Sequence, residues 1–241
     1  ATTHNMFRGC QYAYEDAIDT LGLTQAYHKP TTIVFLGSKK NIYKKNVDGL
    51  FSIAKRYDTI LRMNIFRPTH GINEHSKQFI ISRNTVIDTI KYIAEKYQIL
   101  AINDSYFSSI LIGQTKEDPK ASCSIRILSD GSITPSTYLI DKKYTMANIQ
   151  DANILSNEQI RENLAKITEK IIPTECEGCV YEQTCAGGVY DRRYLWHGTL
   201  RSKDPYCSEP VIETSTNKIV LSKQKFASVH DGYLPTIFFM P

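Results

Sequence analysis

The stretch TILRMNIF, residues 59–66, indicates the class of fold to which the chain belongs. Its central residues alternate, so Arg62 and Asn64 fall on one face of an extended segment and the apolar residues between them on the other. The run ends shortly before Pro68, as a strand should, because the residue before a proline is restricted in backbone conformation. We therefore predict a β-strand with one apolar face and one partly polar face.

Two further strands and two helices are predicted around this segment. The runs at residues 31–36 and 99–102 are nearly continuously apolar, which is typical of strands buried on both faces. One helix is predicted from Asn46 and another from Ser82 or Asn84, each followed by apolar residues at helical spacing. Strands that alternate with helices in this order predict an α/β fold with right-handed parallel crossovers.

Beyond about residue 119 the pattern changes to that of a smaller α+β unit. The pair Asp130-Gly131 predicts the tight turn of a hairpin over residues 124–133. Ser156 and Gln159 have the spacing of a capping box, which predicts a helix that starts there. The cysteine-rich part of the chain follows this helix.

The chain therefore divides into three segments. Residues 1–118 hold the alternating strands and helices, residues 119–210 form the cysteine-rich unit, and residues 211–241 are expected to form a C-terminal tail. Within the tail, residues 218–221 are expected to form an edge strand and residues 237–240 a packed end.

The composition is that of an ordinary globular protein, with 41% hydrophobic and 22% charged residues. The net charge of +4 is spread along the chain, which argues against a nucleic-acid or membrane partner. No apolar run is long enough to span a bilayer, and the first residues lack the features of a signal peptide. We therefore expect a cytoplasmic protein. Because the chain begins with Ala1 and not with methionine, we also expect it to be a fragment or a trimmed product.

Six cysteines are the most informative part of the composition, and four of them form the pattern Cys176-x2-Cys179-x5-Cys185-x21-Cys207. A chain of this length can build its own core, so a metal site in a reducing compartment is favoured over a disulfide framework. Four thiolates suit either a structural zinc ion or a [4Fe–4S] cluster, and the spacing alone leaves both open.

The cysteine-rich unit resembles the SPASM extension of radical S-adenosylmethionine (SAM) enzymes. The positions that carry the resemblance are Cys123, Gly131, Ser136, Cys176, Cys179, Cys185, Val189 and Cys207, with the runs DGSI at 130–133 and DPYC at 204–207. The family pattern has seven cysteines that hold two auxiliary [4Fe–4S] clusters. The resemblance implies that Cys176, Cys179, Cys185 and Cys207 bind the outer cluster.

The second auxiliary cluster of the family has an incomplete ligand set here. The corresponding positions are Cys123, Ser136 and Val189, so only one thiolate remains. Valine has no lone pair, and a serine hydroxyl is a poor replacement for a soft thiolate. We therefore predict one auxiliary [4Fe–4S] cluster and interpret Cys123 as a small buried residue and a doubtful metal ligand.

The first segment resembles the C-terminal part of the radical SAM partial (β/α) parallel barrel, from the motif His4-x3-Arg8-Gly9 onwards. The resemblance implies that Arg62 and Asn64 face the barrel interior, and we assign them with Arg8 to the side that binds SAM or substrate. The alternative for Arg62 is an ion pair with a carboxylate in the barrel wall. Arg67 and His70 follow the strand, where barrel sites gather.

The Cys-x3-Cys-x2-Cys motif that binds the SAM-cleaving cluster is absent, and Cys10 stands alone. We therefore expect the protein to bind SAM and a second [4Fe–4S] cluster, and to be active, only when a part with that motif is joined to this chain. No catalytic residue is assigned in the chain itself. The resemblance then implies an oxidoreductase that modifies a peptide or small protein through a 5′-deoxyadenosyl radical, with a reductant such as flavodoxin or ferredoxin. The alternative is a non-catalytic peptide-binding module or degenerate subunit, stabilised by an iron–sulfur cluster or zinc.

Overall fold

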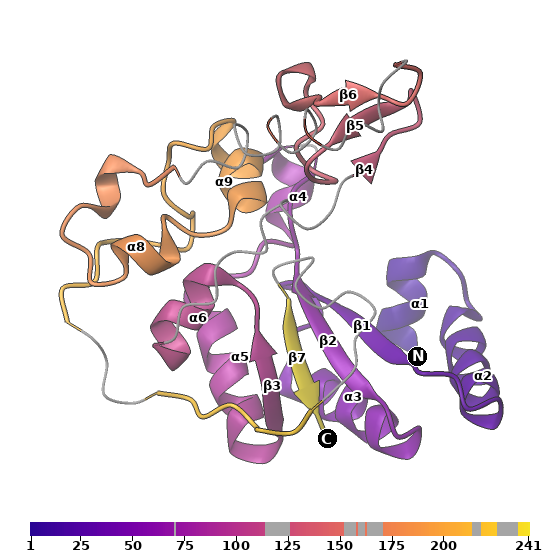
Figure 1. The fold of residues 1–241 in the computed structure, drawn as a ribbon. Coiled ribbons are helices and arrows are strands. Elements are labelled where there is room, and N and C mark those ends of the chain that lie inside the picture. The colour runs from indigo at the N-terminus through magenta and orange to yellow at the C-terminus, as the bar shows by residue number, and fades with distance from the viewer. Residues whose placement is uncertain are drawn as a thin grey trace.

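The computed structural model describes residues 1–69, 71–113, 126–151, 158, 162, 171–213, 218–225 and 236–241 (Figure 1). The helices within these ranges are α1 (Thr2–Arg8), α2 (Ala13–Ala26), α3 (Lys44–Arg56), α4 (Glu74–Lys77), α5 (Arg83–Lys96), α6 (Ser105–Ile112), α8 (Glu182–Cys185) and α9 (Tyr190–His197). Two 3-10 turns, η2 (Lys142–Tyr144) and η3 (Thr174–Cys176), lie in the second half of the chain.

A mixed sheet forms the centre of the first segment. Its strands within the described ranges are β1 (Thr32–Gly37), β2 (Ile60–Ile65), β3 (Gln98–Ile102) and β7 (Ile237–Met240), in the order β1-β2-β7-β3. β1 and β2 are parallel, whereas β7 is antiparallel to both β2 and β3. β3 therefore runs in the same direction as β1 and β2, and the three predicted strands are confirmed in position and direction.

The position of β7 corrects the sequence interpretation. Residues 237–240 are packed, as predicted, but they form a strand that lies between β2 and β3 (Figure 1). The crossover rules place β2 and β3 as near neighbours, and β7 separates them. The edge strand expected at residues 218–221 is also wrong, since residues 218–225 form no strand. They still run beside β3, where the Ser222 amide donates to the carbonyl of Ile99 over 2.8 Å.

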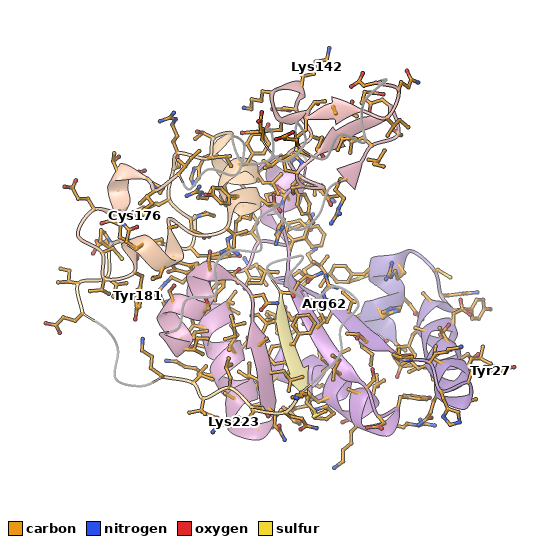
Figure 2. The ribbon with its side chains drawn as sticks, viewed as in Figure 1. Tyr27, Arg62, Lys142, Cys176, Tyr181 and Lys223 are labelled. Carbon is orange, nitrogen blue, oxygen red and sulfur yellow. The ribbon has the colours of Figure 1, made fainter. Side chains whose placement is uncertain are left out.

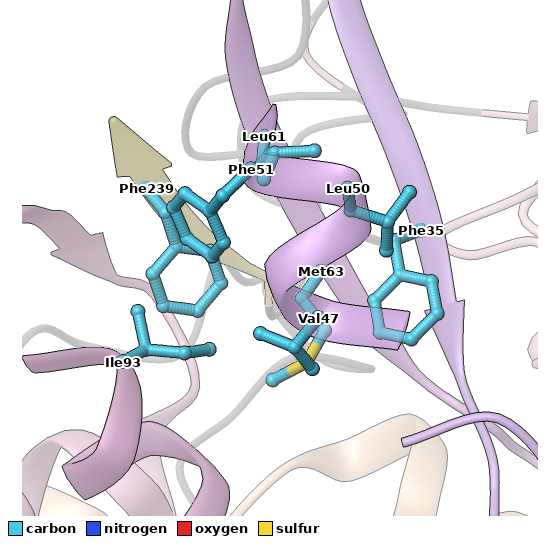
Figure 3. A pocket seen from close by; sticks show the side chains of 8 residues that line it. All are labelled: Phe35, Val47, Leu50, Phe51, Leu61, Met63, Ile93 and Phe239. Carbon is cyan, nitrogen blue, oxygen red and sulfur yellow. The ribbon is translucent and has the colours of Figure 1, made fainter. Parts of the chain in front are cut away.

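Two apolar clusters lie on opposite faces of this sheet, as alternation along the strands requires. The larger joins α3 and α5 to Leu61, Met63 and Phe239, and the smaller includes Ile60 and Phe238. A gap of about 10 Å3 remains between α3 and the sheet (Figure 3). All of its lining side chains are apolar, so it is a packing gap on the helix side and not a binding site.

The helix caps confirm one sequence prediction and correct another. Ser82 caps α5, because its hydroxyl accepts a hydrogen bond from the Thr85 amide over 3.2 Å. The cap of α3 is Tyr43 and not Asn46, whose side chain instead donates to the carbonyl of Asn41. α3 therefore begins before Asn46.

A second, three-stranded sheet follows the first segment, with β4 (Arg126–Ile127), β5 (Ser132–Thr134) and β6 (Ala147–Asn148). β4 and β5 form the predicted antiparallel hairpin. Its turn depends on Gly131, whose φ of 81° is a conformation that other residues rarely adopt. Of the helix predicted from Ser156, only residues 158 and 162 are described, and both are helical.

The predictions for Cys123 and His70, and the predicted boundary near residue 118, fall on residues outside the described ranges. No helix within the described ranges has the length and apolar character that crossing a membrane requires.

Candidate functional site

The four cysteines of the predicted outer cluster come from short turns of one module, residues 171–213. Cys176 ends η3, Cys185 ends α8, and Cys179 lies between these two elements. Cys207 approaches from a later turn, in which its amide donates to the carbonyl of Asp204 over 2.8 Å. All four are free thiols, and Figure 2 shows Cys176 in this module, apart from Arg62 on the sheet.

Burial raises the pKa of Cys176, Cys185 and Cys207, and neighbouring thiols add to the effect. The pKa of Cys176 rises to about 11, chiefly through burial and then through Cys207 and Cys179. Burial also raises the pKa of Cys185, followed by the charges of Asp204 and Asp104, and then by Cys176 and Cys207. The thiols are therefore close enough to act on one another electrostatically, and a cation or cluster must displace their protons to bind.

The donor set is that of a soft metal site. Among the described residues, no group of three or more cysteine, histidine, aspartate or glutamate side chains is found that could hold a single metal ion. Four thiolates suit a zinc ion and a [4Fe–4S] cluster alike. In addition, the Val211 amide donates to Sγ of Cys179 over 3.3 Å, which is a contact suited to a thiolate.

A buried ion network attaches the cysteine module to the sheet. Arg192 of α9, only 1% exposed, lies between Asp104, which follows β3, and Asp204, which precedes Cys207. Its Nη1 lies 2.7 Å from Oδ2 of Asp104, and its Nε lies 3.0 Å and 2.9 Å from the two carboxylate oxygens of Asp204. Burial would lower the pKa of Arg192, but the two carboxylates more than offset this and raise it.

Asp204 also fixes the turns that present the cysteines. Its Oδ2 accepts the amide of Val189 over 3.1 Å, and its Oδ1 accepts the amide of Tyr206 over 3.0 Å. Gly188 has a φ of 87°, and a Cβ there would lie 2.4 Å from Asp204, so only glycine allows this approach. Within the run DPYC at residues 204–207, Asp204 therefore has a structural role in the network in addition to the predicted ligand role of Cys207.

Two positions of the incomplete inner ligand set are used for folding contacts. Oγ of Ser136 donates to Oδ1 of Asp191 over 2.7 Å, and Oδ2 of the same carboxylate lies 3.3 Å from Nη1 of Arg67. Val189 is buried, with its amide bonded to Asp204. Both residues are therefore engaged in contacts with acidic residues of the fold.

Arg67 lies just beyond β2, as predicted for a residue at the carboxyl end of the strands. It connects that end to α9 through Asp191, and its guanidinium lies over the ring of Tyr138 at 5.0 Å. Since Asp104 follows β3 and also contacts α9, the carboxyl ends of β2 and β3 both point towards the cysteine module (Figure 1).

The structure places Arg62 and Asn64 on the sheet face opposite α3 and α5, as the alternation predicts. Arg62 makes no ion pair within the described residues, so the wall carboxylate considered for it is not found there. Arg8 is exposed at the end of α1, and within those residues no hydrogen bond or ion pair joins it to Arg62 or Asn64.

Sequence reasoning missed the network residues and the helix that begins beside them. Asp104 is the N-cap of α6, and Gly113 ends this helix with a φ of 65°. An aspartate before an apolar run that ends in glycine is a start-and-stop signal, so α6 could have been found. Arg192 carried no such signal, because a basic residue in a helix is more commonly solvent-exposed.

Comparison with known proteins gives structural matches only. Neither known protein families nor curated proteins yield a match to the sequence. Solved structures of anSMEcpe, a radical SAM/SPASM anaerobic sulfatase-maturating enzyme, match with TM-scores of 0.60 and 0.61 in the complexes with AdoMet and the Cp18Cys or Kp18Cys peptide. The structure with AdoMet alone gives 0.62, and the identity is 17% in all three.

These matches cover 83% of this chain and 57–58% of the solved chains, so the chain spans less than two thirds of their length. At this identity the likeness shows a shared α/β fold with a mixed, partly parallel sheet.

Proposed function

We propose that this chain is the cluster-binding, C-terminal portion of a radical SAM/SPASM enzyme that modifies a peptide or protein side chain. One observation carries the proposal: four free cysteines lie in one module that a buried Arg192 network connects to the carboxyl ends of the sheet strands. The fold matches a peptide-complexed enzyme structure, which supports the same assignment.

In this proposal Cys176, Cys179, Cys185 and Cys207 hold one auxiliary [4Fe–4S] cluster, and Cys123 is not a ligand. The cluster, when bound, supplies a site for electron transfer, with flavodoxin or ferredoxin as the external reductant. Asp104, Arg192 and Asp204 set the position of the thiols relative to the sheet.

The sheet contributes the other half of the proposed site. Residues 1–118 form the C-terminal part of the partial barrel, residues 119–210 the SPASM-type unit and residues 211–241 the tail, whose last strand β7 completes the sheet. In the same proposal Arg8, Arg62 and Asn64 belong to the side where SAM and peptide bind. SAM and its own cluster supply a hydrogen-abstracting radical once the part with Cys-x3-Cys-x2-Cys is joined to this chain.

The test is to read the gene around the codon for Ala1 and to express the chain together with any residues that are encoded upstream of it. We expect a Cys-x3-Cys-x2-Cys motif in that part, and anaerobic reaction with SAM and dithionite should release 5′-deoxyadenosine from the longer protein only. A start codon next to Ala1, or a longer protein that binds iron but releases no 5′-deoxyadenosine, would favour the non-catalytic peptide-binding module instead.

A further inference from the structure

Two tyrosine rings form a corner on the surface between η2 and α9, and a lysine side chain lies in it. Tyr144 ends η2 and Tyr194 belongs to α9. Their rings stand at 89° to each other, with centroids 5.3 Å apart. The Nζ of Lys143 lies 5.0 Å from the centroid of the Tyr144 ring and 5.1 Å from that of Tyr194. Both distances are those of a cation–π interaction, so the corner has two walls that attract a cation.

Asp141 adds a negative charge to the same corner. Its Oδ2 lies 3.8 Å from Nζ of Lys143 and accepts a hydrogen bond from the hydroxyl of Tyr194. Its backbone carbonyl accepts the amide of Tyr144 over 2.8 Å. Asp141 therefore ties the turn that carries one ring to the hydroxyl of the other. Together, the rings and the carboxylate form an aromatic corner of the kind that recognises ammonium groups.

Both tyrosines of the aromatic corner stay neutral at physiological pH. Burial, followed by the hydrogen bond with Asp141, raises the pKa of Tyr194 to about 12. Burial and then the charge of Asp141 also raise the pKa of Tyr144. The Tyr194 hydroxyl therefore remains a donor to Asp141, and the corner attracts a cation through two ring faces and one carboxylate.

Lys143 is only weakly held in this corner. Its side chain is 55% exposed and that of Asp141 is 53% exposed. Ion pairs at such exposed positions contribute little, because water competes for both charges and a fixed lysine loses rotamer entropy. An ammonium group from another molecule can therefore replace that of Lys143. The corner also suits an ammonium better than a guanidinium, because a planar guanidinium stacks on one ring face while a compact ammonium contacts both.

We propose that Asp141, Tyr144 and Tyr194 form a binding site for a lysine side chain of a peptide, and that Lys143 occupies this site in the free chain as an internal competitor. When the peptide binds, its ammonium takes the place of the Lys143 ammonium, which turns into solvent. The proposal rests on the proposed function only in taking a peptide as the partner.

The test is a proton NMR titration of the anaerobically purified chain, without SAM, into a blocked peptide of one lysine flanked by two glycines on each side. The Hε signals of the peptide lysine should shift upfield, because these protons come to lie against aromatic faces. The same peptide with norleucine in place of lysine keeps the chain length but has no charge, and it should not bind. The arginine peptide should bind about 3-fold more weakly or worse.

Lys143→Ala is the diagnostic variant. It vacates the site, so the lysine peptide should bind about 3- to 10-fold more tightly than to the wild-type chain. Lys142→Ala is the matched control, because it removes the same charge from the preceding residue. Lys142 points outwards at η2 (Figure 2) and lies over neither tyrosine ring, so its loss should leave the affinity unchanged.

The rings are tested in the Lys143→Ala background. Adding Tyr194→Leu removes one wall and should weaken the lysine peptide about 10-fold. Adding Tyr194→Phe keeps the wall and should retain most of the affinity, which guards against a loss that is caused by misfolding of α9.

Equal tightening by Lys143→Ala and Lys142→Ala would show a general charge effect and would overturn the proposal. Equal binding of the lysine peptide and either the norleucine or the arginine peptide would also overturn it, as would failure of the Lys143→Ala chain to bind the lysine peptide. None of these results depends on iron content or on release of 5′-deoxyadenosine, so the proposed function is tested separately.

Discussion

Replacement of Cys179 by alanine is expected to reduce the iron content of the anaerobically reconstituted chain from about four atoms to less than about one. Loss of one thiolate opens the cluster to solvent and to oxidation. The free energy of cluster binding also stabilises the folded turns around the cluster. Loss of the cluster should therefore lower the Tm of the reconstituted protein by about 10 °C or more. Cys176→Ala, Cys185→Ala and Cys207→Ala should behave alike, since all four thiols lie in one module.

Cys10 provides the matched control, because it is exposed after α1 and belongs to another part of the chain. Cys10→Ala should leave both the iron content and the Tm unchanged. Cys123→Ala is the stricter comparison, and it should keep the iron while costing about 1 kcal/mol of stability. Loss of iron in Cys123→Ala equal to that in Cys179→Ala would show that the inner site binds metal, which contradicts the account.

Replacement of Asp104 by alanine should lower the free energy of unfolding by about 3–5 kcal/mol, as measured by urea denaturation. The substitution leaves Arg192 buried with one carboxylate and removes the cap of α6 at the same time. Asp104→Asn separates these effects, because asparagine also caps helices but carries no charge. If the ion network makes the main contribution, Asp104→Asn should show most of the decrease in unfolding free energy that Asp104→Ala shows.

An exposed ion pair serves as the control for this experiment. Lys77 and Glu74 lie 2.6 Å apart on α4, with side chains 57% and 91% exposed, so Lys77→Ala should change stability by less than about 1 kcal/mol. A loss of similar size for Asp104→Ala would show that the network does not hold the cysteine module to the sheet.

The elements predicted correctly are those with a strong local pattern. β1, β2, β3 and α5 each show hydrophobic periodicity over a length typical of their type, and Ser82 marks the start of α5. The alternation in β2 also predicted which face Arg62 and Asn64 occupy. These features depend on neighbouring residues, so one sequence is sufficient to find them.

The features that were missed depend on residues far apart in the chain. β7 pairs with β2 and β3 although more than a hundred residues separate them, and four apolar residues carry no signal for their partners. The Arg192 network is similar, since Asp104 and Arg192 are 88 positions apart. The candidate ligands Cys176, Cys179, Cys185 and Cys207 were named from spacing and family resemblance, but how their module attaches to the sheet required the structure.

The most direct test of the central claim is the content of iron, acid-labile sulfide and zinc in the wild-type chain after anaerobic purification. We predict about four irons and four sulfides per chain, with broad absorption near roughly 400 nm, as thiolate-bound [4Fe–4S] clusters give. Seven or eight irons would show that the inner site is occupied. One zinc per chain with no sulfide would contradict the cluster assignment altogether and leave a structural metal site in its place.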